Sequence, residues 1–180
     1  ASLEKYLSQA LIPALNRNGV ATVGVFRETG KSEPPKMYVL IPYASMAAYD
    51  NVRIQLTKDQ EFQKASEEYN KLPAERPVYD RFDTYFMTAF DGLPKMKVPE
   101  KTQRIFELRI YEGYNEDAVR RKVKMFNEGE FEIFNRTKLT PVFFGELIAG
   151  KEMPALAYMI VFKDMEERDK NWKDFGADPK

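Results

Sequence analysis

The chain contains an internal repeat, and this feature constrains its fold more than any other. Residues 15–62 are echoed about 119 positions later in the same order. Three anchors carry the echo, pairing Leu15-Asn16-Arg17 with Phe134-Asn135-Arg136, Met37-Tyr38-Val39-Leu40-Ile41 with Ala157-Tyr158-Met159-Ile160-Val161, and Asp59-Gln60-Glu61 with Asp178-Pro179-Lys180. Repetition at a constant spacing indicates two copies of one supersecondary unit. The sequence therefore predicts a duplicated fold, although the repeat by itself names no reaction.

The composition allows a packed interior and excludes several classes of partner. With 43% hydrophobic and 13% aromatic residues, the chain has ample material for a core. Its 28 basic residues balance 28 acidic ones, with no long run of either sign. Because binding to nucleic acid requires a basic face, we expect no nucleic-acid partner. No apolar run approaches the roughly 18 residues that a transmembrane helix needs, so we expect no transmembrane segment.

The chain has neither cysteine nor histidine. These absences exclude disulfides, thiol catalysis, histidine-based triads and cysteine-ligated zinc or iron–sulfur clusters. They also exclude a haem held by a proximal histidine or cysteine. Carboxylate pairs on the predicted helices have no further ligands of the right kind, so we expect no metal site and no cofactor.

Hydrophobic periodicity places helices and strands in the same order in both copies. In the first copy it predicts a helix over 3–15, strands over 21–29 and 36–43, a helical stretch over 45–69 and a strand over 81–90. In the second copy it predicts a strand over 104–111, a helix from Asn115 through Phe134, strands over 142–148 and 155–162, and a helix that begins at Asp164.

This order is β-α-β-β-α-β, with the opening strand missing from the first copy and the closing strand missing from the second. Such units form an antiparallel sheet with both helices on one face, the ferredoxin-like arrangement. The other face of each sheet needs a partner, and two sheets packed face to face make an α+β barrel with the helices outside. We therefore expect an α+β protein of two tandem ferredoxin-like units, residues 1–96 and 97–180.

The chain resembles the NIPSNAP family, whose members have a dimeric α+β barrel fold. The resemblance is carried by Phe106-Glu107-Leu108-Arg109-Ile110-Tyr111, similar to the family's E-L-R-x-Y strand, and by the segments 38–43, 59–62, 158–163, 165–168 and Asp178-Pro179. It implies a binding or trafficking-associated role, with no reaction shared across the family. Other proteins on the same barrel include cofactor-independent monooxygenases and haem-degrading enzymes, and the absence of histidine removes the usual haem ligand of the latter.

The segment with the clearest candidate chemistry is the predicted strand over 104–111. Its alternation places Glu107, Arg109 and Tyr111 on one face and apolar side chains on the other. If the apolar face takes the helices, the three polar side chains point into the barrel. There Arg109 could bind a carboxylate with two parallel hydrogen bonds. The alternative is a Glu107–Arg109 pair that only satisfies itself.

Two further groups of residues are candidates for binding. Arg17 and Arg136 occupy equivalent places in the repeat, and two such arginines could mark an anion site. The alternative is that cations favour helix C-termini, where the helix dipole is negative. Tyr38 and Tyr158 could line a pocket for an aromatic or lipid-like ligand, although aromatic residues on strands are also what a sheet core uses.

From the sequence, the favoured function is a non-enzymatic module that binds a small apolar or anionic ligand or a protein partner. The alternative is a cofactor-independent enzyme of the barrel monooxygenase type acting on an aromatic substrate. No catalytic residue is assigned. We expect a homo-oligomer or an intrachain pseudo-dimer. The chain begins at Ala1 without a methionine, which is compatible with an exported bacterial protein that has lost a signal peptide and equally with a cytoplasmic one.

Overall fold

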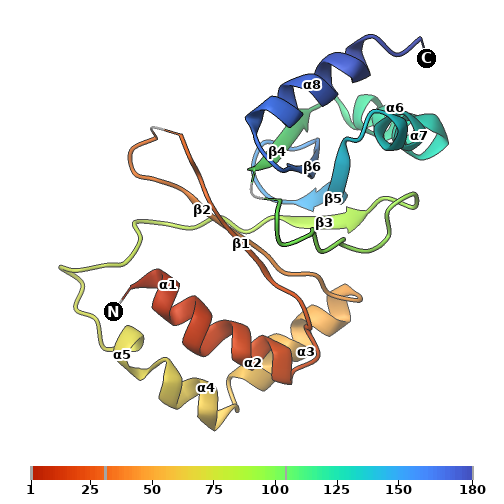
Figure 1. Cartoon of the computed structure of the whole chain (residues 1–180). Helices are drawn as coiled ribbons and strands as arrows, with labels where there is room; N and C mark the ends of the chain where they lie inside the picture. The colour runs from red at the N-terminus through yellow and green to blue at the C-terminus, as the bar shows by residue number, and fades with distance from the viewer. Residues whose placement is uncertain (1, 31, 104, 180) are drawn as a thin grey trace. The chain divides into compact units, whose positions relative to one another are not determined.

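The computed structural model describes residues 2–30, 32–103 and 105–179 and divides into two compact units, residues 1–82 and 83–180 (Figure 1). Arg104, the first residue of a predicted strand, and Lys180, the last residue of the third repeat anchor, lie outside the described residues. Both units combine helices with antiparallel strands, which confirms the α+β class. The domain limits 1–96 and 97–180 remain a prediction.

The first unit is built around one long helix and a two-stranded sheet. The helix consists of α1 (Leu3–Tyr6), a π-helical segment (Leu7–Leu11) and α2 (Ile12–Arg17), and Ser2 caps its start by accepting a hydrogen bond from the Lys5 amide. Strands β1 (Gly24–Arg27) and β2 (Met37–Leu40) pair with each other and are shorter than predicted.

The helical stretch predicted over 45–69 is three helices: α3 (Met46–Leu56), α4 (Gln60–Ala65) and α5 (Glu67–Asn70). The prediction of one helix fails because Asp59 adopts an extended backbone and caps a new helix through the Phe62 amide.

The second unit has a four-stranded antiparallel sheet in the order β3-β5-β6-β4. Its elements are β3 (Phe86–Ala89), β4 (Ile105–Glu112), α6 (Glu116–Met125), a π-helical segment (Phe126–Glu130), α7 (Phe131–Arg136), β5 (Thr140–Ala149), β6 (Ala155–Phe162) and α8 (Met165–Gly176). The sequence places the strand over 81–90 at the end of the first copy, whereas β3 pairs with β5 in the sheet of the second unit.

The repeat seen in the sequence is present in the backbone of the two long helices. Their π-helical segments, Leu7–Leu11 and Phe126–Glu130, lie 119 positions apart. Two positions after the end of each helix stands a residue with positive φ, Gly19 at 87° and Lys138 at 58°. The next amide then donates to a carbonyl of the helix: Val20 to Leu15 at 3.0 Å in the first unit, and Leu139 to Phe134 at 2.9 Å in the second. The duplicated sequence therefore encodes duplicated helix geometry.

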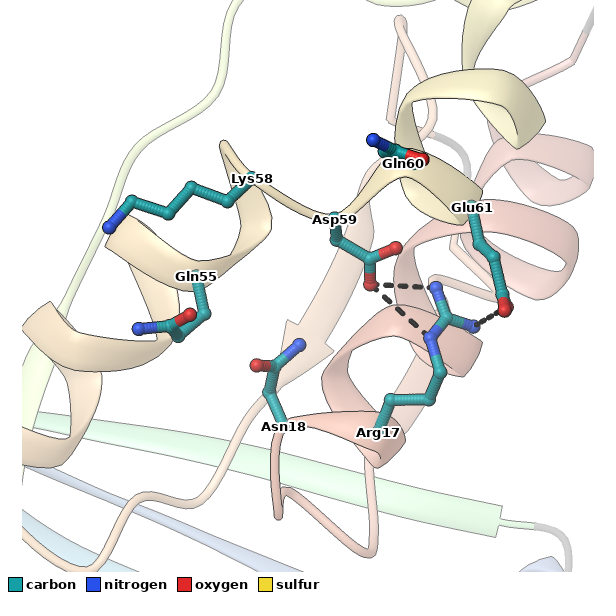
Figure 2. Close-up of a pocket in the computed structure, with 7 residues that line it drawn as sticks. All are labelled: Arg17, Asn18, Gln55, Lys58, Asp59, Gln60 and Glu61. Carbon is teal, nitrogen blue, oxygen red and sulfur yellow. Dashed lines mark hydrogen bonds and ion pairs between the residues drawn. The ribbon is translucent and has the colours of Figure 1, made fainter.

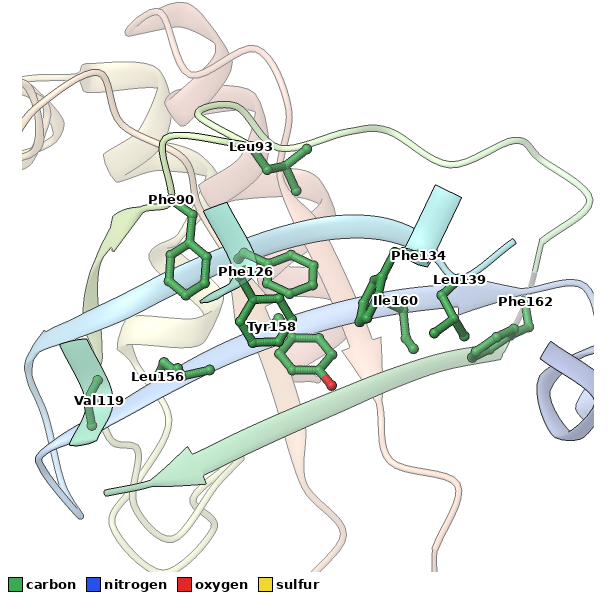
Figure 3. Close-up of a cluster of buried hydrophobic side chains, with 11 residues drawn as sticks. Phe90, Leu93, Val119, Phe126, Phe134, Leu139, Leu156, Tyr158, Ile160 and Phe162 are labelled. Atoms are coloured by element: carbon green, nitrogen blue, oxygen red, sulfur yellow. The ribbon is translucent and has the colours of Figure 1, made fainter. Parts of the chain in front are cut away.

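The largest buried cluster among the described residues lies between the second unit's sheet and its helices, and aromatic rings dominate it (Figure 3). Phe144 of β5 and Tyr158 of β6 stack with ring centroids 4.4 Å apart. Phe126, from the π-helical segment, meets Phe144 edge-on at 5.1 Å. The full cluster is Phe90, Leu93, Val119, Phe126, Phe134, Leu139, Phe144, Leu156, Tyr158, Ile160 and Phe162. In the first unit, Leu15, Val20 and Val52 form a smaller buried cluster, and Leu7, Ala10 and Ala14 of its long helix are also buried.

Truncation of Phe126 tests whether this aromatic cluster stabilises the second unit. Phe126 is 1% exposed, so Phe126→Ala should lower the free energy of unfolding by about 3–5 kcal/mol. Urea denaturation followed by Trp172, the single tryptophan of the chain, measures the change. Val98→Ala, at a residue that is 69% exposed, is the control and should shift stability by less than about 0.5 kcal/mol. Equal effects of the two substitutions would contradict the assignment of the core.

Candidate functional site

The polar residues of β4 lie on the helix-covered face of the sheet, which is the reverse of the sequence expectation. Glu107 accepts a hydrogen bond from Trp172 of α8, and Tyr111 packs against the aromatic core. The strand register explains the reversal. Glu107, Arg109 and Tyr111 stand opposite Ile160, Tyr158 and Leu156 of β6, all of which belong to the core. Because directly opposed residues share a face, the partner strand decides which side of β4 turns inward.

Both carboxylate oxygens of Glu107 accept hydrogen bonds from neighbouring side chains. Its Oε2 accepts from Arg168 Nε at 2.6 Å and from Trp172 Nε1 at 3.2 Å, and its Oε1 accepts from Arg109 at 3.2 Å. Only 17% of the side chain is exposed. Glu107 therefore ties β4 to α8, and its oxygens are already committed to positioning neighbouring side chains.

Arg109 is less fully engaged than Glu107. Its guanidinium lies 4.4 Å from the ring centre of Trp172 and 5.5 Å from that of Tyr111, so it makes cation–π contacts with both. Within the described residues its one hydrogen bond goes to Glu107, and 34% of the side chain is exposed. A guanidinium has five N–H donors. Arg109 therefore presents unused donors at the surface while aromatic rings hold its orientation.

Tyr111 and Tyr158 form a phenol pair between the edge of the sheet and the core. Their hydroxyl oxygens lie 3.4 Å apart and their rings are nearly parallel, with centroids 5.7 Å apart. Burial, together with the hydrogen bond to Tyr111, raises the pKa of Tyr158 well above its usual range. Tyr158 is therefore a neutral hydrogen-bonding group at any physiological pH.

Lys122 and Glu130 lie beside the two tyrosines, and neither was proposed as a site residue from the sequence. Lys122 Nζ lies 5.5 Å from the ring centre of Tyr111 and 5.4 Å from that of Phe126. Glu130 has one buried carboxyl oxygen without a hydrogen-bond partner, and burial raises its pKa, an effect that Lys122 opposes. A signal was present in the sequence, because Glu130 follows the buried Phe126 by four positions and so falls on the buried stripe of its helix.

These side chains make up what we call the Arg109 cluster. Its three cations outnumber its two carboxylates, and the cluster consists of Glu107, Arg109, Tyr111, Lys122, Glu130, Tyr158, Arg168 and Trp172. Arg168 also pairs with Asp169, whose side chain is 67% exposed. In the part of the chain that the structure describes, no carboxylate lies within ion-pair distance of Lys122. Chemically, such an arrangement can attract and orient an anion.

Of the other residues that the sequence proposed for binding, Tyr38 lies in the first unit. It stands on β2 opposite Phe26 of β1, with 37% of its surface exposed. The structure thus brings together Glu107, Arg109, Tyr111 and Tyr158 from that proposal, all within the second unit.

Arg17 and Arg136 each pair with an aspartate of the same unit, which is the third anchor of the repeat. In the first unit Arg17 donates to Asp59 at 2.7 Å and lies 3.2 Å from Glu61 (Figure 2). In the second unit Arg136 makes two bonds of 2.6 Å, one to each carboxyl oxygen of Asp178. The Phe62 amide and Arg17 hold the pKa of Asp59 below its usual range. Because each guanidinium is already paired with a carboxylate, its main role is to link the ends of two helices rather than to bind an external anion. We call these two ion pairs the Arg–Asp clamps.

Beside the Arg17 clamp, Figure 2 shows a shallow polar pocket with a volume of about 400 Å³. Its lining residues are Arg17, Asn18, Gln55, Lys58, Asp59, Gln60 and Glu61. The described residues contain no group of three acidic side chains that could hold a metal ion, and none of the helices described is long and apolar enough to cross a bilayer.

The clamp of the second unit should contribute more to stability than an ordinary surface ion pair. Arg136 binds Asp178 through two bonds, and only 8% of the Asp178 side chain is exposed. We expect Arg136→Ala to lower the urea midpoint further than Arg120→Ala, which removes the exposed pair with Asp117. A double-mutant cycle with Asp178→Ala should return a favourable coupling between the two side chains. A coupling free energy of zero would show that the Arg136–Asp178 ion pair does not stabilise the folded protein.

Removal of the Glu130 charge should change how stability depends on pH. Because the folded state raises the pKa of Glu130, folding takes up protons between the unfolded and folded pKa values, and stability falls as pH rises through that window. We expect Glu130→Gln to be more stable than the parent protein at pH 7.5 and to lose this advantage at pH 4. Urea unfolding at both pH values measures it, with the exposed Glu128→Gln as control. If the difference in free energy of unfolding between parent and variant were the same at both pH values, the prediction would be contradicted.

Comparisons with known proteins do not narrow the assignment. No family model matches the chain, and no curated protein matches it. What the site can do therefore has to be argued from its own geometry, in which aromatic rings hold two cations at the half-exposed edge of a sheet.

Proposed function

We propose that this protein is a non-enzymatic binding module that takes a small organic anion at the Arg109 cluster. The observation that carries the proposal is that Arg109 and Lys122 both lie 5.5 Å from the ring centre of Tyr111. Two cations held at one aromatic ring form a local positive site in a chain whose overall charge is zero. A carboxylate is the natural counterpart, because a guanidinium can bind both of its oxygens.

The chemistry of the neighbouring groups fits binding better than catalysis. The oxygens of Glu107 are engaged by three donors, so this carboxylate is not available as a base. Tyr158 has a raised pKa and stays protonated, so its hydroxyl is not available as a nucleophile. Orientation by Trp172 and Tyr111 also reduces the entropy that Arg109 loses when it engages a ligand.

Aromatic surface beside the two cations favours a ligand with an apolar body. Tyr111 is partly buried and packs against the aromatic core, and the ring centre of Trp172 lies 4.4 Å from the Arg109 guanidinium. We therefore assign the ligand class as small carboxylates with an aromatic or aliphatic body.

The finer description of the fold belongs to the same proposal. We propose that the two units are tandem ferredoxin-like copies of the NIPSNAP type, that they form an α+β barrel and that the protein works as an oligomer or an intrachain pseudo-dimer. Support comes from the π-helical segments 119 positions apart and from the two Arg–Asp clamps at the same spacing. The boundary between residues 96 and 97 follows from the linker Asp91-Gly92-Leu93-Pro94 and from Pro99, which precedes the next apolar run.

One observation favours the alternative function, a cofactor-independent enzyme. Glu130 is a carboxyl group with a buried, unpartnered oxygen and a raised pKa, and its charge acts on Tyr158. General acid–base catalysis uses groups of this kind. If the alternative holds, an aromatic carboxylate should be turned over as well as bound, and Glu130→Gln should stop turnover while binding persists.

A titration with matched charged and neutral compounds tests the binding function. Benzoate and decanoate should quench or shift the fluorescence of Trp172, whereas benzamide and decanol should not. Arg109→Ala and Lys122→Ala should each weaken carboxylate binding at least about tenfold, because each removes one charge-assisted contact. Lys124→Ala is the matched control, since Lys124 is exposed and pairs with Glu128 on the same helix.

Equal affinity for benzoate and benzamide would contradict the assignment of an anion site. So would carboxylate binding that survives both Arg109→Ala and Lys122→Ala. Native mass spectrometry of the purified protein adds a second readout, because a retained small acid would be seen as a mass that disappears on denaturation.

A further inference from the structure

The first unit carries an open groove that none of the functions above uses. Its volume is about 520 Å³, and it lies where α5 ends and the following loop begins. The lining residues are Tyr69, Asn70, Leu72, Pro73, Ala74, Pro77, Val78, Tyr79, Asp80 and Arg81. Two proline rings and two tyrosine rings contribute to its lining, and an acidic and a basic residue adjoin each other at one end of the lining sequence.

The aromatic wall of this groove is held in place from behind. Tyr69 stacks on Tyr6 of α1 with ring centroids 3.9 Å apart and an interplanar angle of 17°. Tyr69 also bonds to Tyr79, and burial together with this bond raises the pKa of Tyr69. A wall of fixed aromatic rings is the kind of surface on which proline-rich segments dock.

The loop between β1 and β2 offers a segment of complementary chemistry. Glu33, Pro34, Pro35 and Lys36 are consecutive and all exposed. The base of the loop is closed by the Glu28 amide, which donates to the Lys36 carbonyl at 3.0 Å, and Ser32 Oγ donates to Glu28 Oε2 at 2.6 Å. Two proline rings are thus presented at the surface between one negative and one positive charge.

The loop does not fill the groove of its own chain. In Figure 1 the described part of the loop lies well away from α5, whose residues Tyr69 and Asn70 line the groove. Glu33, Lys36, Asp80 and Arg81 make no ion pair within the described ranges 2–30, 32–103 and 105–179. Arg81 donates to the Asp80 backbone carbonyl, at 2.6 Å. Within the described residues, each side therefore has one acid and one base without an ion-pair partner, and the charges are complementary in number and sign.

We propose that the β1–β2 loop of one copy of this chain occupies the Tyr69/Tyr79 groove of a second copy. Pro34 and Pro35 pack against the tyrosine rings, Glu33 meets Arg81, and Lys36 meets Asp80. Exchange of the two loops across a twofold axis uses both contacts in each dimer and closes the assembly. Exposed ion pairs are individually weak, so the association is concentration-dependent rather than permanent.

A charge swap tests this contact without disturbing the fold, because both target side chains are exposed. Sedimentation velocity over a wide range of concentration should show monomers and dimers in exchange. Glu33→Lys and Arg81→Glu should each weaken dimerisation at least about tenfold, because two repulsive contacts replace two attractive ones. The double variant, with both substitutions in one chain, should restore it. Lys101→Glu, at another exposed cation, should leave the dimer unchanged.

Three results would overturn the proposal. The first is a monomer at every concentration. The second is a dimer that Glu33→Lys and Arg81→Glu do not affect, which would place the interface on another surface. The third is a groove that binds an unrelated proline-rich peptide but not a synthetic peptide of residues 32–37, which would make the occupant a foreign protein. The circular dichroism of each variant is measured first, so that only folded variants are compared. The variant with both Pro34→Ala and Pro35→Ala then gives a second test that changes no charge, and it should also weaken dimerisation.

Discussion

Packing of one long helix against strands β5 and β6 is the interaction on which the second unit depends. Phe126 and Phe134 project from this helix into the rings of Phe144 and Tyr158, and every one of these four side chains is 1% exposed. Aromatic rings of this size bury large apolar areas and fix each other's orientation. The π-helical segment that contains Phe126 also contains Glu130, so the turn that completes the core also places a carboxyl group beside Tyr158.

Comparison of the two copies within the chain separates what the fold needs from what one copy has acquired. Both long helices have the π-helical segment, although the first has Pro13 where the second has Glu132, so proline is not what produces it. Both end with a side chain bonded to a carbonyl four positions earlier, from Asn18 and from Thr137. By contrast, Glu130 corresponds to the apolar Leu11. The buried carboxyl group is therefore a property of the second copy alone.

The sequence predicted the order of elements well because periodicity and capping act locally. Asn115 and Asp164 cap the helices that follow them, as their positions before apolar stripes indicated. It failed for the helical stretch over 45–69, where the cap at Asp59 competes with continuation of the helix. It also missed the pairing of β3 with β5, because nothing local in a strand specifies its partner.

For the candidate site, sequence reasoning found four members of the Arg109 cluster but placed three of them, Glu107, Arg109 and Tyr111, on the face away from the helices. The alternation in β4 shows which residues share a face of the strand, but it does not show which of the two faces the helices cover. Strand β6 is buried over its whole length, so its pattern does not resolve the choice either. Only the register and the position of Trp172 do so.

The same geometry explains why charged groups persist next to an aromatic core. Strand β4 lies at the edge of its sheet, so side chains on its covered face can bury their stems while their charged ends reach solvent. Arg109 does this, with its guanidinium against Trp172 and a third of the side chain exposed. A neutral residue would pack there at lower cost in desolvation. Lys122 has no carboxylate partner in the described part of the chain, so packing alone does not account for its charge. An anion that met both Lys122 and Arg109 at Tyr111 would.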